Sequence, residues 1–251
     1  MVVGRHARGV GRGGLQHQPV PPHAGAPHLP LVDDGEHVRA LEALRARPDV
    51  DGDRLLLAGH SEGALLAAAA AARGAAVRGV VLLSPSATPG EELLRWQAAQ
   101  IAPTLPRPVR LLLRMLRTDL EAKGEANRRR IAATTTDVAR IGGVRVNARW
   151  TREFMAHDPR DDLRRIAVPV LAVTGAKDLQ VRADDLRVVA DLVAGPVETH
   201  RVPDLTHTLR RQPGQPSLSR YRRELREPVD GEVLATVTGW CRRVTGDRPL
   251  G

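Results

Sequence analysis

The sequence is poor in cysteine, in aromatic residues and in long apolar runs. Among 251 residues Cys241 is the one cysteine, which excludes an intrachain disulfide and a thiolate metal cluster. Cys241 follows Trp240 in a stretch with helical apolar spacing, which predicts a packed thiol on a helix. No apolar run approaches the roughly 20 residues of a membrane helix, and residues 1–14 lack the apolar core of a secretion signal. We therefore expect a cytoplasmic protein without stable membrane insertion.

The scarcity of aromatic residues also limits the possible partners. Aromatic residues make up 2% of the chain and hydrophobic residues 42%, so the core must be aliphatic. The formal net charge is +9, and nearly all cations are arginines, because Lys123 and Lys177 are the only lysines. Nucleic-acid binding needs a basic stripe interleaved with stacking aromatics, which one Phe and one Tyr cannot provide. We expect no nucleic-acid partner and interpret the arginines as solvated surface residues.

The first part of the chain gives no chemical signal. Residues 1–30 are rich in Pro, His and Gly without periodicity, which predicts an irregular N-terminal segment. His17, His23 and His28 lack the carboxylate or thiolate neighbours and the helical spacing of a metal site. We therefore expect neither a metal nor another cofactor.

The stretch from Arg54 to Ala72 carries the clearest signal. An apolar run predicts a strand buried on both faces, and the alanine-rich second half predicts a helix. Between them lies G-x-S-x-G, formed by Gly59, Ser61 and Gly63. A strand, a sharp turn and a helix in this order distinguish a nucleophile elbow from a chance match. We expect a Cβ at either glycine to collide across the turn, and Ser61 to adopt a strained backbone conformation.

Two later motifs extend this signal: Gly175 to Val181, and Leu205-Thr206-His207. Together with Gly59 to Gly63 they resemble the α/β-hydrolase fold, and more narrowly the bacterial esterases grouped with the serine aminopeptidase (S33-like) hydrolases. The similarity covers roughly residues 31 to 245, with the motifs in the family's order of Ser, Asp and His. The resemblance implies an α/β fold with a mostly parallel sheet flanked by helices.

The motifs also assign a catalytic triad. Ser61 is the expected nucleophile and His207 the general base, while Asp178 holds the imidazole tautomer and stabilises the imidazolium. Asp178 follows the predicted strand Val168–Thr174, at the carboxyl end where open α/β sheets place their active sites. The backbone N–H of Glu62 is expected to provide one donor of the oxyanion hole.

Other polar residues near these motifs have competing interpretations. Asp204 is a rival acid, although three residues before His207 is poor geometry for orienting the ring. His200 lies within the predicted strand Val197–Val202 and is expected to be a packed or edge histidine. His60 is expected to support the turn of the elbow.

An insertion is predicted between two parts of the catalytic core. Residues 31–85 and 166–251 form the predicted α/β core, and residues 86–165 a helical lid. The resemblance implies that this lid shapes the acyl pocket and excludes water. Helices are expected at Glu91–Ala102, Arg107–Leu120 and Asn127–Ala139.

The pocket lining is predicted from the apolar residues of this lid. We expect Trp150, Phe154 and Met115 to bind substrate. The stretch Arg110 to Arg117 is both apolar and basic, which is compatible with a segment on an anionic membrane surface. Its shortness favours a lid helix whose Leu and Met side chains face the pocket while its arginines stay in water.

The resemblance further implies that N-terminal strands are missing. Arg8-Gly9-Val10-Gly11 resembles the loop after the family's fourth strand, with Val2-Val3 as the stub of that strand. About three strands precede this point in the family, and the loop after the third supplies a second oxyanion donor. We expect either an incomplete version of a longer hydrolase, which we favour, or a natural shortened relative.

The expected function is therefore that of a serine hydrolase. It would cleave carboxylic esters of small molecules through an acyl-enzyme on Ser61. A serine in the elbow argues against dehalogenase or epoxide hydrolase chemistry. Two alternatives stay open: a thioesterase or aminopeptidase with the same machinery, and a catalytically impaired, truncated hydrolase that acts only as a binding module.

Overall fold

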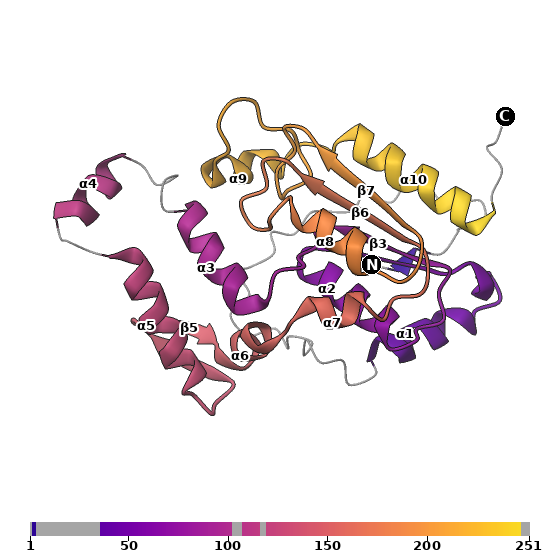
Figure 1. The fold of residues 1–251 in the computed structure, drawn as a ribbon, viewed down its shortest axis with the longest axis horizontal. Coiled ribbons are helices and arrows are strands. Elements are labelled where there is room, and N and C mark those ends of the chain that lie inside the picture. The colour runs from indigo at the N-terminus through magenta and orange to yellow at the C-terminus, as the bar shows by residue number, and fades with distance from the viewer. Residues whose placement is uncertain (1, 4–35, 102–106, 116–118, 247–251) are drawn as a thin grey trace, which may run out of the picture.

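The computed structural model describes residues 2–3, 36–101, 107–115 and 119–246 (Figure 1). Within these residues the main sheet has the strand order β1-β2-β3-β6-β7, in which β1 pairs antiparallel with β2 and the other pairs are parallel. Its strands are β1 Val2–Val3, β2 Leu56–His60, β3 Gly79–Leu83, β6 Val170–Gly175 and β7 Val197–Val202. The expected α/β class, with a mostly parallel sheet flanked by helices, is confirmed.

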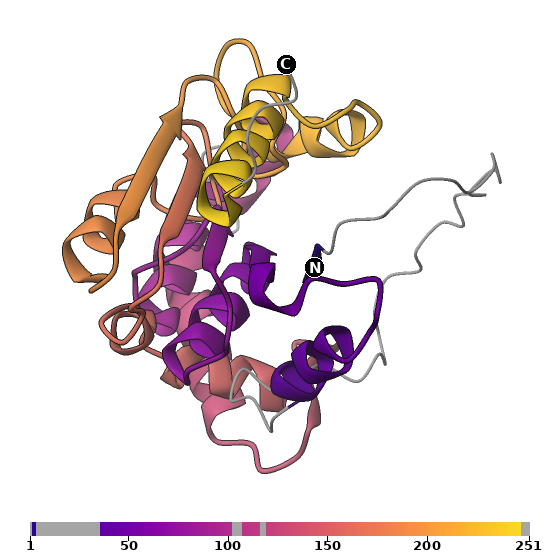
Figure 2. The same ribbon diagram turned by 90° about the vertical axis from the view of Figure 1, so that its right-hand side faces the viewer.

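Helices cover both faces of this sheet, with α10 on one side and α8 on the other (Figures 1 and 2). One core cluster joins the sheet to α1, α2, α7 and α8, and a second joins it to α10. The described part of the chain has no helix both long and apolar enough to cross a membrane. The helices are α1 Glu36–Arg45, α2 Glu62–Ala72, α3 Gly90–Ile101, α4 Arg107–Met115, α5 Leu120–Ala132, α6 Ala148–Ala156, α7 Pro159–Leu163, α8 Asp185–Leu192, α9 Tyr221–Glu224 and α10 Gly231–Thr245.

The central strands are buried on both faces because their apolar runs are continuous. In β3, Val80 and Leu82 pack in the cluster beneath α2, whereas Val81 packs in the cluster beneath α10. All three side chains are fully buried. Since successive side chains of a strand point to opposite faces, only an uninterrupted apolar run can fill both layers. Trp240 on α10 is buried with the second layer, and Cys241 packs beside it, as expected of a thiol on a helix.

The prediction of an all-helical insertion is wrong in one part. Val138–Ile141 (β4) and Val144–Asn147 (β5) form an antiparallel hairpin, and α5 ends at Ala132 before it begins. The turn consists of Gly142 and Gly143, whose φ angles are 58° and 84°. Positive φ at both central residues is the condition for the tight hairpin turn that matches strand twist. The Gly-Gly pair between alternating β-branched residues was the signal that the helical interpretation overlooked.

Several N-terminal predictions lie outside the described residues. They concern Arg8 to Gly11 and His17, His23 and His28. Val2 and Val3, which are described, form a strand as expected, opposite Leu57 and Leu56.

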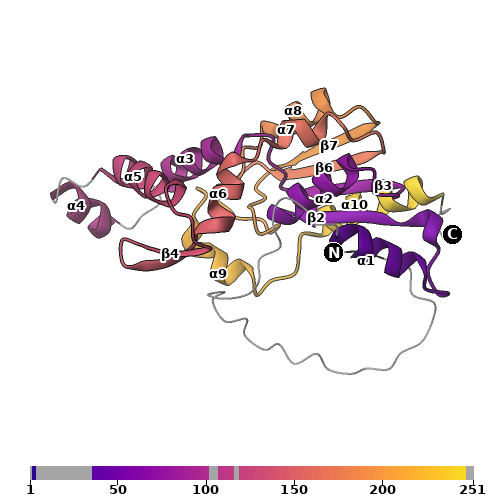
Figure 3. The same cartoon turned by 90° about the horizontal axis from the view of Figure 1, so that it is seen from below.

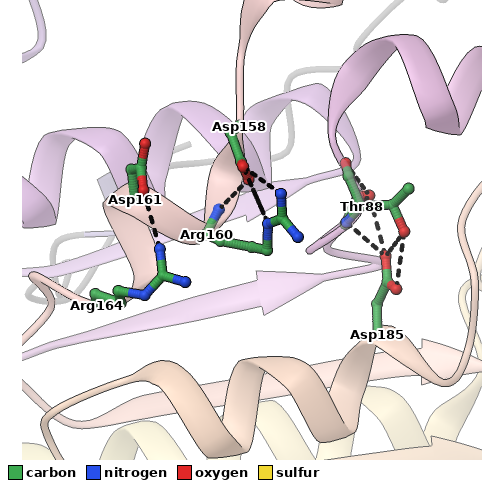
Figure 4. Close-up of polar contacts among 7 residues, drawn as sticks. Thr88, Asp158, Arg160, Asp161, Arg164 and Asp185 are labelled. Carbon is green, nitrogen blue, oxygen red and sulfur yellow. Dashed lines mark hydrogen bonds and ion pairs between the residues drawn. The ribbon is translucent and has the colours of Figure 1, made fainter.

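The two ends of the insertion are tied together through the backbone. The N–H of Gly90, at the start of α3, donates to the carbonyl oxygen of His157 at 3.0 Å. Asp158 then caps α7, accepting from the N–H of Arg160 at 3.1 Å, and also pairs with the Arg160 guanidinium (Figure 4). The residues from Phe154 to Pro159 thus have a structural role, because they join the end of the insertion to its beginning.

A buried carboxylate fixes the connection between β3 and α3. Asp185, at the start of α8, is 6% exposed and accepts from the N–H groups of Ala87 and Thr88 at 2.8 and 3.1 Å. It also accepts from the hydroxyls of Ser86 and Thr88 at 3.1 and 3.0 Å (Figure 4). Four donors offset the cost of burying the charge, so that α8 and the first residues of the insertion form one unit.

Asp185→Ala is expected to lower the free energy of unfolding by about 3 kcal/mol, because it leaves buried donors without an acceptor. The neighbouring Asp184→Ala is the matched control. The Asp184 side chain is 88% exposed and pairs with Arg201 at the surface, so we expect a change below about 0.5 kcal/mol. Urea denaturation of both variants measures the difference, and equal losses would contradict the assignment.

A second carboxylate, Asp230, should make stability depend on pH. It caps α10, accepting from the N–H groups of Glu232 and Val233, and its side chain is 12% exposed. A hydrogen bond from the Arg211 guanidinium at 2.7 Å lowers the pKa of Asp230 below its usual 3.8. The unfolded chain therefore takes up this proton first, so the stabilisation is full above pH 3.8 and is lost as the pH falls through the lowered pKa.

Asp230→Asn keeps a good cap but removes the charge, and should cost about 1 kcal/mol near neutral pH. The difference from the wild type should shrink as the pH approaches about 3. Urea denaturation curves across this range provide the measurement. A loss that is independent of pH would assign the effect to capping alone.

Candidate active site

The strand β2 and the helix α2 meet at Ser61 in a strained turn. Ser61 has φ 55° and ψ −117°, in the region that residues with a side chain rarely adopt. Its N–H donates to the carbonyl of Leu83 at 2.9 Å, and its own carbonyl accepts from the N–H of Ala64 at 2.9 Å. Ser61 thus lies between the last residue of β2 and the first residue of α2, bonded to both the sheet and the helix, and its hydroxyl makes no capping hydrogen bond. The strain expected from the sequence is confirmed.

The glycines of the motif have different roles. A Cβ on Gly59 would lie 1.9 Å from the carbonyl oxygen of Gly63 and 2.6 Å from the nitrogen of Ala64. A Cβ on Gly63 would meet nothing within 4 Å, so the prediction of a collision at Gly63 is wrong. The reason is that Gly63 presents its backbone, and not its Cβ position, to the strand. The close approach of β2 and α2 is therefore made possible by Gly59.

Gly59→Ala is expected to cost more than about 3 kcal/mol or to abolish folding, since backbone atoms on both sides cannot move aside. Gly63→Ala should leave stability unchanged or raise it by up to about 1 kcal/mol, because Ala is the better helix former. Thermal unfolding of the two variants tests this. Similar losses for both would show that the contact does not control the elbow.

The structure brings Asp178 and His207 together. Nδ1 of His207 lies 2.8 Å from Oδ2 of Asp178, and the two side chains are 7% and 0% exposed. The other oxygen of Asp178 accepts from the N–H groups of Gln180 and Val181 at 2.8 and 3.1 Å. The carboxylate is therefore fixed in orientation, and it favours the tautomer in which Nδ1 carries the hydrogen and Nε2 can accept a proton.

Strand pairing accounts for this convergence. β6 and β7 are parallel neighbours, so the loops that follow them leave the same end of the sheet. We call the loop that contains Asp178 the acid loop and the loop that contains His207 the base loop. The N–H of Lys177 donates to the carbonyl of Leu205 at 2.9 Å. Gly175 ends β6 so close to the same residue that a Cβ there would lie 2.1 Å from the Leu205 oxygen.

His60 joins the base loop to the elbow. Its Nε2–H donates to the carbonyl of His207 at 2.8 Å, and the centroids of the two rings are 4.8 Å apart. Removal from water lowers the pKa of His60, and the neighbouring His207 lowers it further, which favours the neutral donor. Because His60 immediately precedes Ser61, these contacts link the loop of His207 to the turn that holds Ser61. The sequence predicts that His60 supports the turn of the elbow, and its ring instead contacts the backbone and the ring of His207.

Asp204 and His200 lie elsewhere. The carboxylate of Asp204 is 55% exposed and pairs with Lys177 at 2.5 Å, a hydrogen bond that lowers the pKa of Asp204. His200, on β7, pairs at 2.7 Å with Glu198 and is 39% exposed. The acid that contacts His207 is therefore Asp178.

Trp150, a residue of the insertion, reaches the elbow. Nε1 of Trp150, on α6, donates to Oε1 of Glu62 at 2.5 Å. Glu62 directly follows Ser61 and begins α2, so this bond ties the lid to the residue expected to provide the oxyanion donor. The Trp150 ring also stacks on Phe154, with the centroids 5.1 Å apart. The sequence suggested the backbone role of Glu62 but not this use of its side chain.

The other two predicted substrate residues have different surroundings. Phe154 is 7% exposed and packs with Leu65 and Leu93 in a small apolar cluster. Leu111 and Met115 of α4 are 61% and 74% exposed instead of facing a pocket. The helix α4 lies at the outer end of the insertion, away from α2 (Figures 1 and 3). Substrate binding by Phe154 and Met115 stays a prediction, and the exposure of Met115 does not favour it for that residue.

A comparison with known protein families agrees with the motif order of Ser61, Asp178 and His207 on this fold. Residues 8–213 match the hydrolase family described as serine aminopeptidase, S33. The chain belongs to this family. The resemblance suggested by the three motifs is thereby confirmed for the larger part of this S33 sequence.

More distant similarities agree with this assignment. Esterase EstD of Thermotoga maritima is 24% identical over 217 residues, which cover 84% of this chain and 47% of the esterase. The S33 chain therefore spans about half the length of that relative. The structure of DcsB in complex with a substrate analogue is similar with a TM-score of 0.53 and 17% identity, covering 86% of this chain and 73% of DcsB. The hydrolase GrgF from Penicillium sp. sh18 has a TM-score of 0.51 and 15% identity, with coverages of 84% and 71%. These two structures show the shared fold alone.

Proposed function

We propose that this S33 family chain is a serine hydrolase that cleaves carboxylic esters of small molecules through an acyl-enzyme on Ser61. The observation that carries this proposal is the buried pair of His207 and Asp178, held against the residue that precedes a strained serine. The similarity to an esterase supports an ester as the substrate.

The geometry suggests the roles of the three residues. With the hydrogen of His207 on Nδ1 and donated to Asp178, Nε2 is the atom that takes the proton of the Ser61 hydroxyl during attack. The imidazolium then returns the proton to the leaving alcohol. Water activated by the same nitrogen releases the acid from the acyl-enzyme. Each step uses side chains of this chain and needs no cofactor.

Glu62 is the proposed oxyanion donor. Its N–H is among the first of α2, where helix N–H groups have no partner within the helix and the helix dipole favours negative charge. One such donor contributes about 3 kcal/mol to lowering the barrier. We further propose that Trp150, fixed by the Glu62 side chain, forms the wall of the substrate site beside this donor.

The leaving group of the substrate distinguishes an esterase from a thioesterase and an aminopeptidase. The family description includes aminopeptidases, so turnover of an aminoacyl anilide is the second candidate activity. Rates with a nitrophenyl ester, a thioester and an aminoacyl anilide separate the esterase from the thioesterase and the aminopeptidase. Absence of turnover with all three, together with retained ligand binding, would favour the binding module.

Ser61→Ala is expected to abolish stoichiometric labelling by a fluorophosphonate and to lower ester turnover by at least about 10³-fold, because the acyl acceptor is removed. Ser219→Ala, which changes an exposed serine next to α9, is the control and should label like the wild type. Intact-mass spectrometry and nitrophenolate release are the measurements. Unchanged labelling of Ser61→Ala would refute the proposal.

A further inference from the structure

A buried carboxylate contacts the residues on both sides of His207. Glu224, at the end of α9, is 5% exposed, and its Oε2 accepts from the hydroxyls of Thr206 and Thr208 at 2.8 and 2.7 Å. Its Oε1 accepts from Nε2 of Gln212. Thr206, Thr208 and Gln212 are themselves 0%, 8% and 1% exposed. We call these four residues the brace: Thr206, Thr208, Gln212 and Glu224.

The brace acts on a tight reversal of the chain. The N–H of Thr206 donates to the carbonyl of Arg210 at 2.9 Å, and the N–H of Leu209 donates to the carbonyl of Thr206 at 3.0 Å. Leu209 has a φ of 60°, which a residue with a branched side chain adopts only when its surroundings impose it. Anchoring both threonines on one carboxylate restricts His207, between them, to the direction of Asp178 and the elbow.

Further contacts orient the brace and connect it to the acid loop. Oε1 of Gln212 accepts from the N–H of Ser217 at 2.6 Å, so Nε2 of the same amide is the atom that faces Glu224. Nζ of Lys177, adjacent to Asp178, donates to the backbone carbonyl of Gln212 at 2.7 Å. The acid loop and the base loop therefore share a support on the side of α9.

Tyr221 is the first residue of α9, three positions before Glu224. Its hydroxyl is buried and makes no hydrogen bond within the described part of the chain. Burial raises the pKa of Tyr221, and the charge of Asp178 raises it further.

We propose that Glu224 is a positioning residue for catalysis: through Thr206 and Thr208 it holds the backbone of His207 at the place where the imidazole meets both Asp178 and Ser61. The inference rests on the proposed function in that it takes His207 as the base. A purely local role in α9 does not account for the contacts, because the carboxylate accepts from the base loop and not from its own helix.

Thr208→Val and Thr208→Ser test this on the full chain. Val keeps the shape but loses the hydroxyl, and should lower kcat for a nitrophenyl ester about tenfold with KM unchanged, since a small displacement of a catalytic group has large effects. Ser keeps the hydroxyl and should retain kcat within about twofold. The double variant Thr206→Val, Thr208→Val should lose about 100-fold. Glu227→Gln, at an exposed carboxylate just after α9, is the control without an effect.

A second readout does not depend on turnover. The proton between Nδ1 of His207 and Asp178 should give a low-field proton resonance, because it lies in a short, buried hydrogen bond. In Thr208→Val this proton should exchange with water at least about tenfold faster, and in Thr208→Ser as slowly as in the wild type. If Ser61→Ala keeps full activity, the proposed function is refuted. The resonance still tests whether the brace positions His207, because it is measured without substrate turnover.

Three results would overturn the positioning role. One is Thr208→Val with kcat and the proton resonance both unchanged. Another is an equal loss in the Val and Ser variants, which would assign the effect to packing. The third is a rise in KM with kcat preserved, which would place the effect on substrate binding. Thermal unfolding of each variant shows that the protein compared is folded.

Discussion

The contact between Gly59 and the backbone of Gly63 is the constraint on which the rest of the site depends. With no Cβ between them, the end of β2 and the start of α2 approach closely enough to force Ser61 to a φ of 55°. That conformation turns the hydroxyl away from the helix cap it would otherwise make, and it leaves the N–H of Glu62 at the helix start. The positions of the proposed nucleophile and of the proposed oxyanion donor thus result from one steric relation.

The pairing of neighbouring strands brings Asp178 and His207 together. Asp178 and His207 are 29 residues apart in the chain, but the parallel pairing of β6 and β7 places both loops at one edge. The loops are then joined by backbone bonds, and His60 links them to the elbow. Because each of these groups is held by rigid elements or by backbone hydrogen bonds, little ordering remains to be done when a substrate arrives.

Exposed and buried carboxylates in this protein differ in their hydrogen-bond partners. Arginines pair with carboxylates mainly at the surface, as Arg164 does with Asp161 in Figure 4, and such pairs add little stability. Among the buried carboxylates of the described residues, Asp162 accepts from the guanidinium of Arg165 at 2.9 Å. Three others accept from neutral donors: Asp178 from imidazole and backbone, Asp185 from hydroxyls and backbone, and Glu224 from hydroxyls and an amide. Each joins segments that are distant in sequence, so buried negative charge serves here to fix loops around the site.

The α/β class and the main strands could be predicted from the sequence, and so could Ser61, Asp178 and His207 as candidate site residues, because apolar runs and short motifs are local properties of the chain. The β4–β5 hairpin was not predicted, nor were the different surroundings of Gly59 and Gly63. The contact of His207 with Asp178 and not with Asp204, the exposure of Met115 and the hydrogen bonds of Glu224 to Thr206 and Thr208 became evident from the three-dimensional arrangement alone. These outcomes depend on which loops meet in space, and contacts between distant segments leave no periodic pattern in a single sequence.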